Sequence, residues 1–534
     1  MDDDISNVDN IKEKERNEIK NVGPSKLALS LRKDKINQKI GKYRILKEKD
    51  KEKVEFGNKE INNLSNLSRE LNSEKDNKKL TDILDKIYFF LSNFEGPIES
   101  DFVGISKIIP NLFSKLVLLK ENQNIVKKIF DIFYQIVRLI PPNDLIGKLG
   151  KIFNNENCQF FYGLIDFYQN DYIIIEKFFS FLCDLIKKSN LMKIYLMTKP
   201  GFDFIQAAFS LDNKYQNFVI KLMSSFCSLD QMNDESMKEF QLFYVEKCNK
   251  IISLFYDENH TEPKNVINNS FNFINLYKCL YFISLSDNND VLDIFLISKN
   301  SNDKTLYEKI LCFEKLDSDN LCSETLKITG NLYCSSEKRH VQSLIKCNSH
   351  TYVMNILSER FNKNIDIRNA SWAISNFVGI EEYRKIFIKN NYIKDLIIVL
   401  RRNNNYEVRV EILNAICNLI IAINREDILT FVNSDLALSC IEILINIKEP
   451  HILELTLRIV EFLLFKSSPD ILSNNSFTNI SDKFTNPFIY QFENHNLPQI
   501  LKNIANTYKN EISSEFSLNI LNLYFNDDDK IMID

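Results

Sequence analysis

Apolar residues recur at positions i, i+3 and i+4 along nearly the whole chain after residue 80, and short polar turns separate the stretches that carry them. This spacing places apolar side chains on one face of a helix and predicts amphipathic α-helices. The 534 residues include only 11 glycines and 11 prolines, which argues against a turn-rich β-protein. We therefore predict an all-α protein, and a chain of this length requires several domains or an elongated repeat array.

One helical frame recurs along the chain. The segment IRNASWAISN places Trp372 and Asn376 one turn apart on the same helix face. A single such frame is equally typical of a core tryptophan beside a solvated asparagine. However, EILNAICNL places Asn418 at the position of Asn376, and ETLKITGNL places Asn331 there. A helical unit that repeats at about 40–47 residues is typical of armadillo and HEAT solenoids, and about ten repeats are expected here.

The same phase extends to earlier and later helices. Its asparagine position falls successively at Gln135, Asp184, Ser225, Ser284, Asn331, Asn376, Asn418 and Glu461. The intervals are 41–49 residues except for one of 59 after Ser225, which we attribute to an irregular insertion at 231–264. In the early repeats, the tryptophan position is taken by Asp131, Ser180, Lys221 and Leu280.

The segments RNASWAISNFVG and TLKITGNLYCSSEKRHVQSLIKCNSHTYVMNIL resemble the later armadillo repeats of importin-α, the nuclear-import adaptor. Most repeats of that family carry W-A-x-S-N, and one carries an R-x-x-G-N variant that residues 327–331 match with lysine in place of arginine. The resemblance is specific over roughly 323–445 and weak before 270. It implies an all-α, right-handed superhelical armadillo-repeat solenoid with a basic N-terminal arm.

The resemblance also implies a peptide-binding site. Importin-α binds basic peptides at a major site on early repeats and a minor site on later ones. The residues that match the minor site are Lys327, Asn331, Trp372, Asn376, Glu411 and Asn418. Asparagine amides can clamp a peptide backbone, a tryptophan face attracts a lysine, and acidic residues select cations. In the major-site region the asparagine and tryptophan ladder is lost, so we expect that region not to bind a basic signal.

A basic segment precedes the repeats. Residues 24–53 contain eleven Lys or Arg and four Asp or Glu, a net charge of +7, whereas the rest of the chain sums to −12. A solvated charged helix is the plain alternative. The order LSLRKDK followed by IGKYR resembles the importin-β-binding arm of importin-α. The resemblance assigns importin-β contacts to Arg32, Lys33, Lys35, Lys39, Lys42 and Arg44.

These observations predict a domain order: a disordered N-terminus (1–22), the arm (23–60), a loose linker (61–79), armadillo repeats (80–466), a divergent C-terminal repeat region (467–525) and an acidic tail (526–534). Within the divergent region we expect an irregular loop to about residue 487 and then a pair of helices.

No catalytic chemistry is indicated. The sequence has no phosphate-binding loop, no HExxH and no GxSxG, and its five histidines show no ligand spacing. Eleven scattered cysteines without a CxxC pair are typical of reduced thiols in a cytosolic or nuclear protein. The N-terminus does not resemble a signal peptide, and no apolar run approaches the ~18 residues of a membrane span. We expect no enzyme activity, no catalytic residue, no cofactor and no metal.

The favoured interpretation is an importin-α-like adaptor that shuttles between cytoplasm and nucleus. The partners that the resemblance implies are importin-β, cargo proteins with basic nuclear localisation signals, and a nuclear export receptor. We expect no direct contact with nucleic acid, because the basic charge is confined to one arm, and none with a membrane. The alternative is a divergent armadillo-repeat scaffold for protein–protein interaction without a role in nuclear import.

Overall fold

The computed structural model describes residues 58–94, 103–141, 149, 155–197, 201–211, 215–227, 238–256, 273–298, 303–316, 318–359, 363–468, 486–509 and 511–525. They fall into two compact units, an N-terminal unit that ends at residue 316 and a C-terminal unit that begins after it. Every secondary-structure element in the described ranges is a helix, so the all-α prediction is confirmed. The predicted disordered N-terminus, the acidic tail and most of the predicted loop before residue 487 lie outside the described residues.

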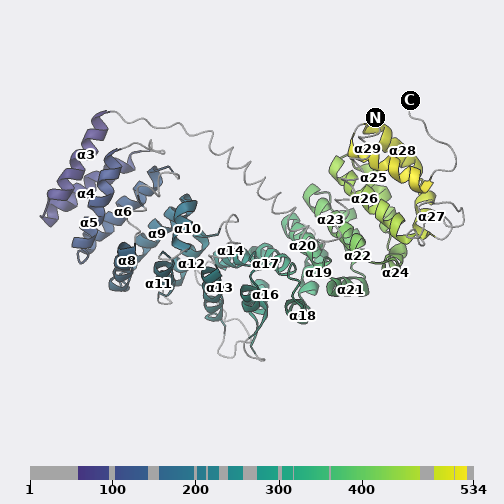
Figure 1. Ribbon diagram of the computed structural model, residues 1–534, viewed down its shortest axis with the longest axis horizontal. Helices are drawn as coiled ribbons and strands as arrows, with labels where there is room; N and C mark the ends of the chain where they lie inside the picture. Colours follow the sequence, from purple (N-terminus) through teal and green to yellow (C-terminus); the bar gives the residue numbers. More distant parts are fainter. Residues whose placement is uncertain are drawn as a thin grey trace, which may run out of the picture. The chain divides into compact units, whose positions relative to one another are not determined.

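One layer of the N-terminal unit contains five helices, each stacked against the next in chain order (Figure 1). We call helices of this layer, here and in the C-terminal unit, ladder helices, because most of them carry the recurring frame. In the N-terminal unit they are α4 (Asn77–Ser92), α6 (Gln123–Leu139), α9 (Tyr172–Lys188), α12 (Gln216–Ser225) and α14 (Phe273–Ile283).

The remaining helices of this unit pack outside the ladder helices. Helix α3 contacts α5, α8 contacts α11, and α13 contacts both α11 and α16. Their bounds are α3 (Asn58–Ser73), α5 (Val103–Leu118), α8 (Asn155–Phe167), α10 (Asn190–Met197), α11 (Gly201–Phe209), α13 (Lys238–Ser253), α15 (Asn289–Leu296) and α16 (Leu306–Leu316).

Two segments that we predicted to be irregular are helical. Helix α3 occupies much of the predicted linker and packs on α5, where Leu64 and Leu71 are fully buried. These two leucines lie seven residues apart, which is two helical turns, and Leu67 between them completes an i, i+3, i+7 spacing that is typical of a helix and that our prediction of a loose linker overlooked. The predicted insertion at 231–264 likewise contains α13, which buries Phe240 and Tyr244. The repeats therefore begin before residue 80.

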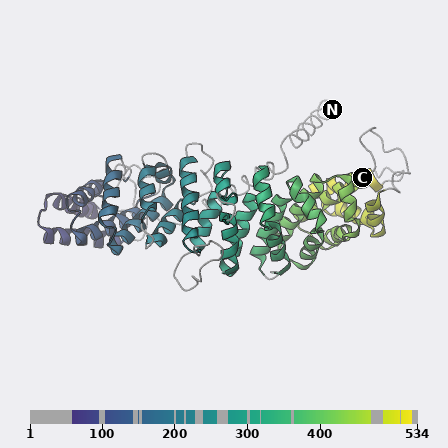
Figure 2. The same ribbon diagram turned by 90° about the horizontal axis from the view of Figure 1, so that it is seen from below.

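The C-terminal unit has the same arrangement. Its five ladder helices stack in chain order (Figures 1 and 2), and they are α17 (Ser318–Leu332), α20 (Asn364–Phe377), α23 (Tyr406–Ala422), α26 (Pro450–Ser467) and α29 (Ile512–Ile520). The two units thus contain ten ladder helices among the described residues, in agreement with the expected ten or so repeats.

Between successive ladder helices of the C-terminal unit, the chain forms a first helix and then an outer helix. These helices are α18 (Lys338–Lys346), α19 (Ser349–Glu359), α21 (Glu381–Lys389), α22 (Ile393–Arg402), α24 (Arg425–Leu429) with the 3₁₀ turn η5 (Thr430–Asn433), α25 (Leu436–Asn446), α27 (Pro487–Asn494) and α28 (Leu497–Thr507). A π-helical turn, η7 (Leu521–Phe525), follows α29. Three helices therefore precede it after residue 486, where we predicted a pair.

Local sequence sets where the ladder helices begin. Side-chain oxygens of Asp or Asn accept hydrogen bonds from backbone N–H groups of the first turn and so satisfy donors that have no partner within the helix. The residues that cap ladder helices in this way are Asp76, Asn122, Asp171 and Asn405.

The C-terminal ends of several ladder helices are bound by a cation from the next ladder helix. The guanidinium of Arg138 on α6 donates to the carbonyl of Phe94 after α4 at 2.8 Å. Lys188 on α9 donates to the carbonyl of Val137 on α6 at 2.7 Å. Lys466 on α26 donates to the carbonyl of Ile423, directly after α23, at 2.7 Å. Such cations satisfy terminal carbonyls and interact favourably with the negative end of the helix dipole.

Candidate peptide-binding face

The predicted asparagine ladder lies on adjoining helices of the C-terminal unit. Asn376 on α20 donates from Nδ2 to the carbonyl oxygen of Gly330 on α17, at 2.8 Å. Asn418 on α23 donates from Nδ2 to Ser375 Oγ on α20, also at 2.8 Å. Each side chain therefore reaches back to the residue just before the ladder position of the preceding helix. The phase that we inferred from the sequence over these three helices matches their stacking.

Both asparagines are half-buried, so part of each amide faces solvent. Their Nδ2 groups bond within the protein, and neither Oδ1 atom has a hydrogen-bond partner among the described residues. A carboxamide oxygen is a hydrogen-bond acceptor with two lone pairs. The face formed by α17, α20 and α23 can therefore accept hydrogen bonds from the backbone N–H groups of an extended peptide.

Trp372 is placed differently from our expectation. Its side chain is only 7% exposed and lies against Gly330 of α17. A Cβ atom built on Gly330 would lie 2.4 Å from Cζ3 of the indole, so the ring occupies the space that any larger residue would fill. The expectation that Trp372 offers an open π-face to a lysine is wrong, because the glycine lets the ring pack onto the neighbouring backbone.

The structure adds a buried member that the sequence analysis did not identify. Asn369 on α20 is 6% exposed and donates from Nδ2 to Ser323 Oγ on α17 at 2.9 Å. It precedes Asn376 by seven residues, which is two helical turns, so both lie on the side of α20 that faces α17. That spacing is the signal that would have revealed it.

The charged candidates lie on the same three helices. Lys327 on α17 forms an ion pair with Glu324, one turn earlier, at 2.8 Å. Its charge is therefore matched locally. Glu411 on α23 is half-buried. Arg368 on α20 forms an ion pair with Glu407 on α23, which adds a further link between these helices.

The N-terminal unit carries ion pairs where the C-terminal unit has tryptophan and asparagine. Asp131, at the predicted tryptophan position of α6, pairs with Lys177 on α9. Asp85 on α4 pairs with Lys128 on α6 in the same way. These pairs span 46 and 43 residues, which is one repeat. Neighbouring ladder helices are thus linked by opposite charges in this unit.

The early asparagine positions form no ladder of amides. Ser225 Oγ bonds the carbonyl of Lys221 at 2.9 Å, and Ser284 Oγ bonds that of Tyr281 at 2.7 Å. Both bonds stay within one helix or its final turn. Ser225 and Ser284 therefore do not repeat the side-chain amide oxygens that Asn376 and Asn418 offer to a peptide backbone on α20 and α23.

The six basic residues proposed to contact importin-β, Arg32, Lys33, Lys35, Lys39, Lys42 and Arg44, lie outside the described residues. Their assignment stays a prediction.

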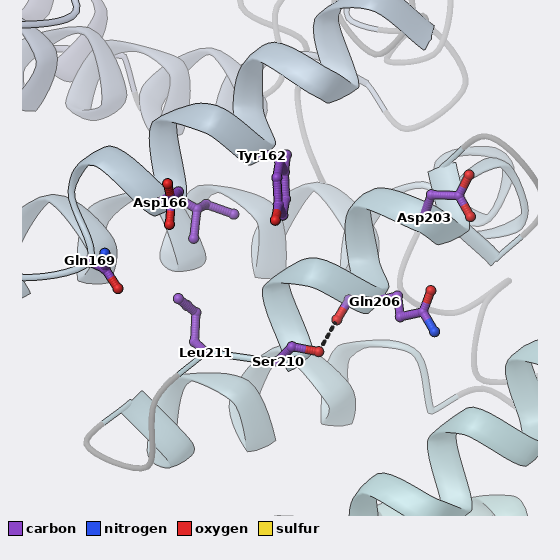
Figure 3. A pocket seen from close by; sticks show the side chains of 8 residues that line it. Tyr162, Asp166, Gln169, Asp203, Gln206, Ser210 and Leu211 are labelled. Atoms are coloured by element: carbon purple, nitrogen blue, oxygen red, sulfur yellow. Dashed lines mark hydrogen bonds between the residues drawn. The ribbon is translucent and has the colours of Figure 1, made fainter.

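An open groove lies between the outer helices α8 and α11, with a volume of about 370 Å³. Tyr162 and Asp166 line it from α8, and Asp203 and Gln206 line it from α11 (Figure 3). Ser210 closes one end and donates from Oγ to the carbonyl of Gln206 at 2.8 Å. The carboxylates of Asp166 and Asp203 in this groove are exposed. The described residues contain no group of three His, Cys, Asp or Glu that could hold a metal ion.

In the described part of the chain, no single helix has the length and apolarity needed to cross a membrane. One pair of helices, Arg425–Asn433 and Leu436–Asn446, is long and apolar enough when the two are taken together, but the pair is bent by 72°.

Comparison with known proteins establishes the fold alone. No family model matches the sequence, and no curated protein matches it significantly. An engineered protein of known structure superposes with a TM-score of 0.60 at 11% identity, over 86% of this chain and 98% of that one. A chain from a structural study of the phosphorylation switch between cadherin and β-catenin gives a TM-score of 0.52 at 10% identity, over 86% and 85%.

A designed armadillo-repeat protein also matches, with a TM-score of 0.38 at 17% identity over 48% of this chain and 96% of that one. The stacked helices and the match at a TM-score of 0.52 define the fold: the chain is an all-α armadillo-repeat solenoid, as predicted. The finer resemblance, to importin-α, is carried by the sequence segments described above.

Proposed function

We propose that this protein is a binding adaptor that holds an extended, lysine- and arginine-rich peptide on the face formed by α17, α20 and α23. The observation that carries the proposal is the pair of asparagines, Asn376 and Asn418, on adjoining helices with their Oδ1 atoms open to a ligand. An extended peptide presents backbone N–H groups at regular intervals, so acceptors on successive helices suit it better than they suit a compact ligand. Asn331 occupies the equivalent position on α17 and would extend the contact.

Selection for cations would come from acidic side chains near the ladder. Glu411 lies on α23, seven residues before Asn418, and therefore on the same side of the helix. Glu407 lies one turn earlier, paired to Arg368. Because Trp372 is buried, its role in the proposed site is to position Asn376 and the backbone of α17, and not to stack on a lysine.

The sequence resemblance extends this proposal to nuclear import. In that account, the bound peptides are basic nuclear localisation signals, and the arm at 23–60 binds importin-β while the protein shuttles between cytoplasm and nucleus. The net charge of +7 on residues 24–53, against −12 for the rest of the chain, supports binding of the arm to an acidic partner. Export would then use a further receptor.

Two measurements test the proposal. Fluorescence anisotropy of the full-length protein with a labelled Lys/Arg-rich peptide should show saturable binding, and a peptide of the same length with Glu in place of the basic residues should not bind. Immobilised importin-β should retain the full chain but not a variant that lacks residues 1–57, a deletion that ends before α3 and so spares its buried leucines. Equal binding of both peptides contradicts the peptide proposal, and retention of the shortened chain contradicts the arm proposal.

The ion pairs of the N-terminal unit favour a second candidate. Asp131 and Lys177 form an ion pair that joins α6 to α9 at a position where most importin-α repeats carry tryptophan, so charged side chains link the helices of this unit. A scaffold for partners unrelated to nuclear import needs no peptide ladder in this unit and would retain these ion pairs. Capture of importin-β by neither form of the chain, combined with absent basic-peptide binding, would support this alternative.

A further inference from the structure

The groove between the outer helices α8 and α11, which we call the α8–α11 groove, carries unpaired negative charge. Its described lining includes Asp166 and Asp203 but no lysine, arginine or histidine. Among the described residues, neither of these two carboxylates forms an ion pair. Asp171, which follows shortly after α8, is by contrast paired, with its carboxylate 3.3 Å from Lys127 Nζ. The α8–α11 groove is therefore locally acidic and attracts a cation.

An exposed aromatic ring stands beside these carboxylates. Tyr162 is 55% exposed and precedes Asp166 on α8 by one helical turn, so both side chains lie on the same helix face. Asp203 lies on α11, the opposite wall, and Figure 3 shows the Tyr162 ring between the two aspartates. Phe161 and Ile165 supply the packing of α8, since both are buried, so the core does not account for the tyrosine ring. An open ring face next to carboxylates attracts a cation that can lie over the ring.

The rest of the lining suits the long side chain of arginine. Ile165 and Leu211 offer apolar contacts for its methylene groups, and Gln169 and Gln206 carry amide oxygens that accept hydrogen bonds. A guanidinium is planar and has five N–H donors, so it can stack on a ring and bond carboxylates at its edge at the same time. A lysine ammonium has no plane to stack, and a methylated lysine is bound by a cage of several rings. With one ring and two carboxylates, the α8–α11 groove favours arginine.

We propose that the α8–α11 groove binds an arginine side chain from an exposed segment of a partner protein. The guanidinium lies over the ring of Tyr162 and donates hydrogen bonds to Asp166 and Asp203, which together supply the negative charge that a cation lacks in solution. The groove belongs to the outer helices of the N-terminal unit, whereas the peptide face proposed above is formed by ladder helices of the C-terminal unit. The two proposals therefore rest on different residues and can fail separately.

The test uses small probes that each represent one side chain. Saturation-transfer NMR measures the binding of N-acetyl-arginine amide and of N-acetyl-lysine amide to the full-length protein at low salt. We expect the arginine probe to bind at least about threefold more tightly than the lysine probe, because only the guanidinium can stack and bond at once. Its affinity should fall as ionic strength rises, since both carboxylates are exposed. Equal affinity for the two probes, or no saturable binding of the arginine probe, overturns the proposal.

Variants at exposed positions assign the binding to the groove without disturbing the core. The Asp166→Asn, Asp203→Asn double variant removes both carboxylates and should weaken binding of the arginine probe by about twofold to thirtyfold. Tyr162→Leu should weaken it by about twofold to fivefold, whereas Tyr162→Phe keeps the ring and should bind nearly as well as the unmodified protein. The control is Asp82→Asn, which removes an exposed carboxylate from α4. Losses no larger in the groove variants than in this control overturn the proposal.

Two further comparisons identify the occupant. Glu411→Gln alters the peptide face of the C-terminal unit, and the loss caused by the Asp166→Asn, Asp203→Asn double variant should be the same in its presence and in its absence. The variant that lacks residues 1–57 tests whether the basic arm of this chain fills the groove instead. We expect it to bind the arginine probe as tightly as the full chain does. Tighter binding after the deletion would show that the arm is the occupant and would overturn the assignment to a partner protein.

Discussion

The indole ring of Trp372 lies directly on the backbone of Gly330, one helix away. The carbonyl oxygen of the same glycine accepts the hydrogen bond from Asn376, which follows Trp372 by one helical turn. Two side chains of α20 therefore use a single residue of α17, one through packing and one through a hydrogen bond. The tryptophan and asparagine frame joins neighbouring repeats here, in addition to any role in binding.

Replacement of Gly330 tests this packing. Gly330→Ala places a methyl group where the indole lies, and forcing extra volume into a packed core costs about 1–3 kcal/mol of unfolding free energy. Urea denaturation followed by circular dichroism measures the loss. The matched control is Gly163→Ala on α8, where a Cβ would meet nothing within 4 Å. Because alanine favours helix over glycine, the control should be neutral or stabilising. Equal losses in the two variants would contradict the packing account.

The cation at the end of α23 gives a second stability prediction. Lys466 donates hydrogen bonds to the carbonyls of Ile421 and Ile423, and burial together with the charge of Arg384 lowers the pKa of this lysine. Lys466→Met keeps the length of the side chain but leaves these carbonyls without that donor, so we expect a loss of about 1–3 kcal/mol. Lys502→Met, at an exposed position of α28, is the control in the same denaturation experiment. A loss no larger than in the control would rule out this capping role.

His350 predicts a pH dependence of stability. Burial lowers the pKa of His350, its Nδ1 has no hydrogen-bond partner among the described residues, and its ring stacks on Phe377 at 6.0 Å between centroids. The unfolded state therefore binds this proton more readily than the folded state, so stability is full above the unfolded pKa of about 6.5 and falls as pH decreases below it.

The matching variant is His350→Phe, which keeps an aromatic ring and removes the titration. Its unfolding free energy should fall less between pH 7 and pH 5 than that of the unmodified protein. His495→Phe, at an exposed position after α27, is the control. Parallel pH profiles for the unmodified protein and His350→Phe would show that His350 does not contribute.

Salt should distinguish the contributions to peptide binding. Contacts between cationic side chains and Glu411 are screened as ionic strength rises, whereas hydrogen bonds to asparagine amides depend on it much less. Affinity for a Lys/Arg-rich peptide should therefore fall between low and high salt, and Glu411→Gln should reduce that dependence. Salt dependence that is unchanged in Glu411→Gln would exclude this residue from the site.

Spacing along the sequence was enough to place Asn376 and Asn418 on adjoining helices, because a helical period combined with a repeat of 42 residues fixes which positions align. It did not reveal that each Nδ2 is used within the protein. It also did not show that Trp372 is buried, because this burial depends on the space that Gly330 leaves on a neighbouring helix. Helix α3 was missed although Leu64, Leu67 and Leu71 follow the spacing of one helix face, because the many polar residues around them were interpreted as a loose linker.

The central claim is that Asn376 and Asn418 bind a peptide as well as linking helices. The direct measurement is the affinity of a labelled Lys/Arg-rich peptide for the Asn376→Ala, Asn418→Ala double variant, compared with Asn369→Ala. Asn369 makes the same kind of link to α17 but is 6% exposed and out of a peptide's reach, so it reports the effect of losing a helix link alone. Two lost peptide hydrogen bonds, at ~0.5–1.5 kcal/mol each, predict an affinity weaker by about fivefold to a hundredfold in the double variant and near-normal affinity in Asn369→Ala. Equal affinity of both variants for the peptide would contradict the account.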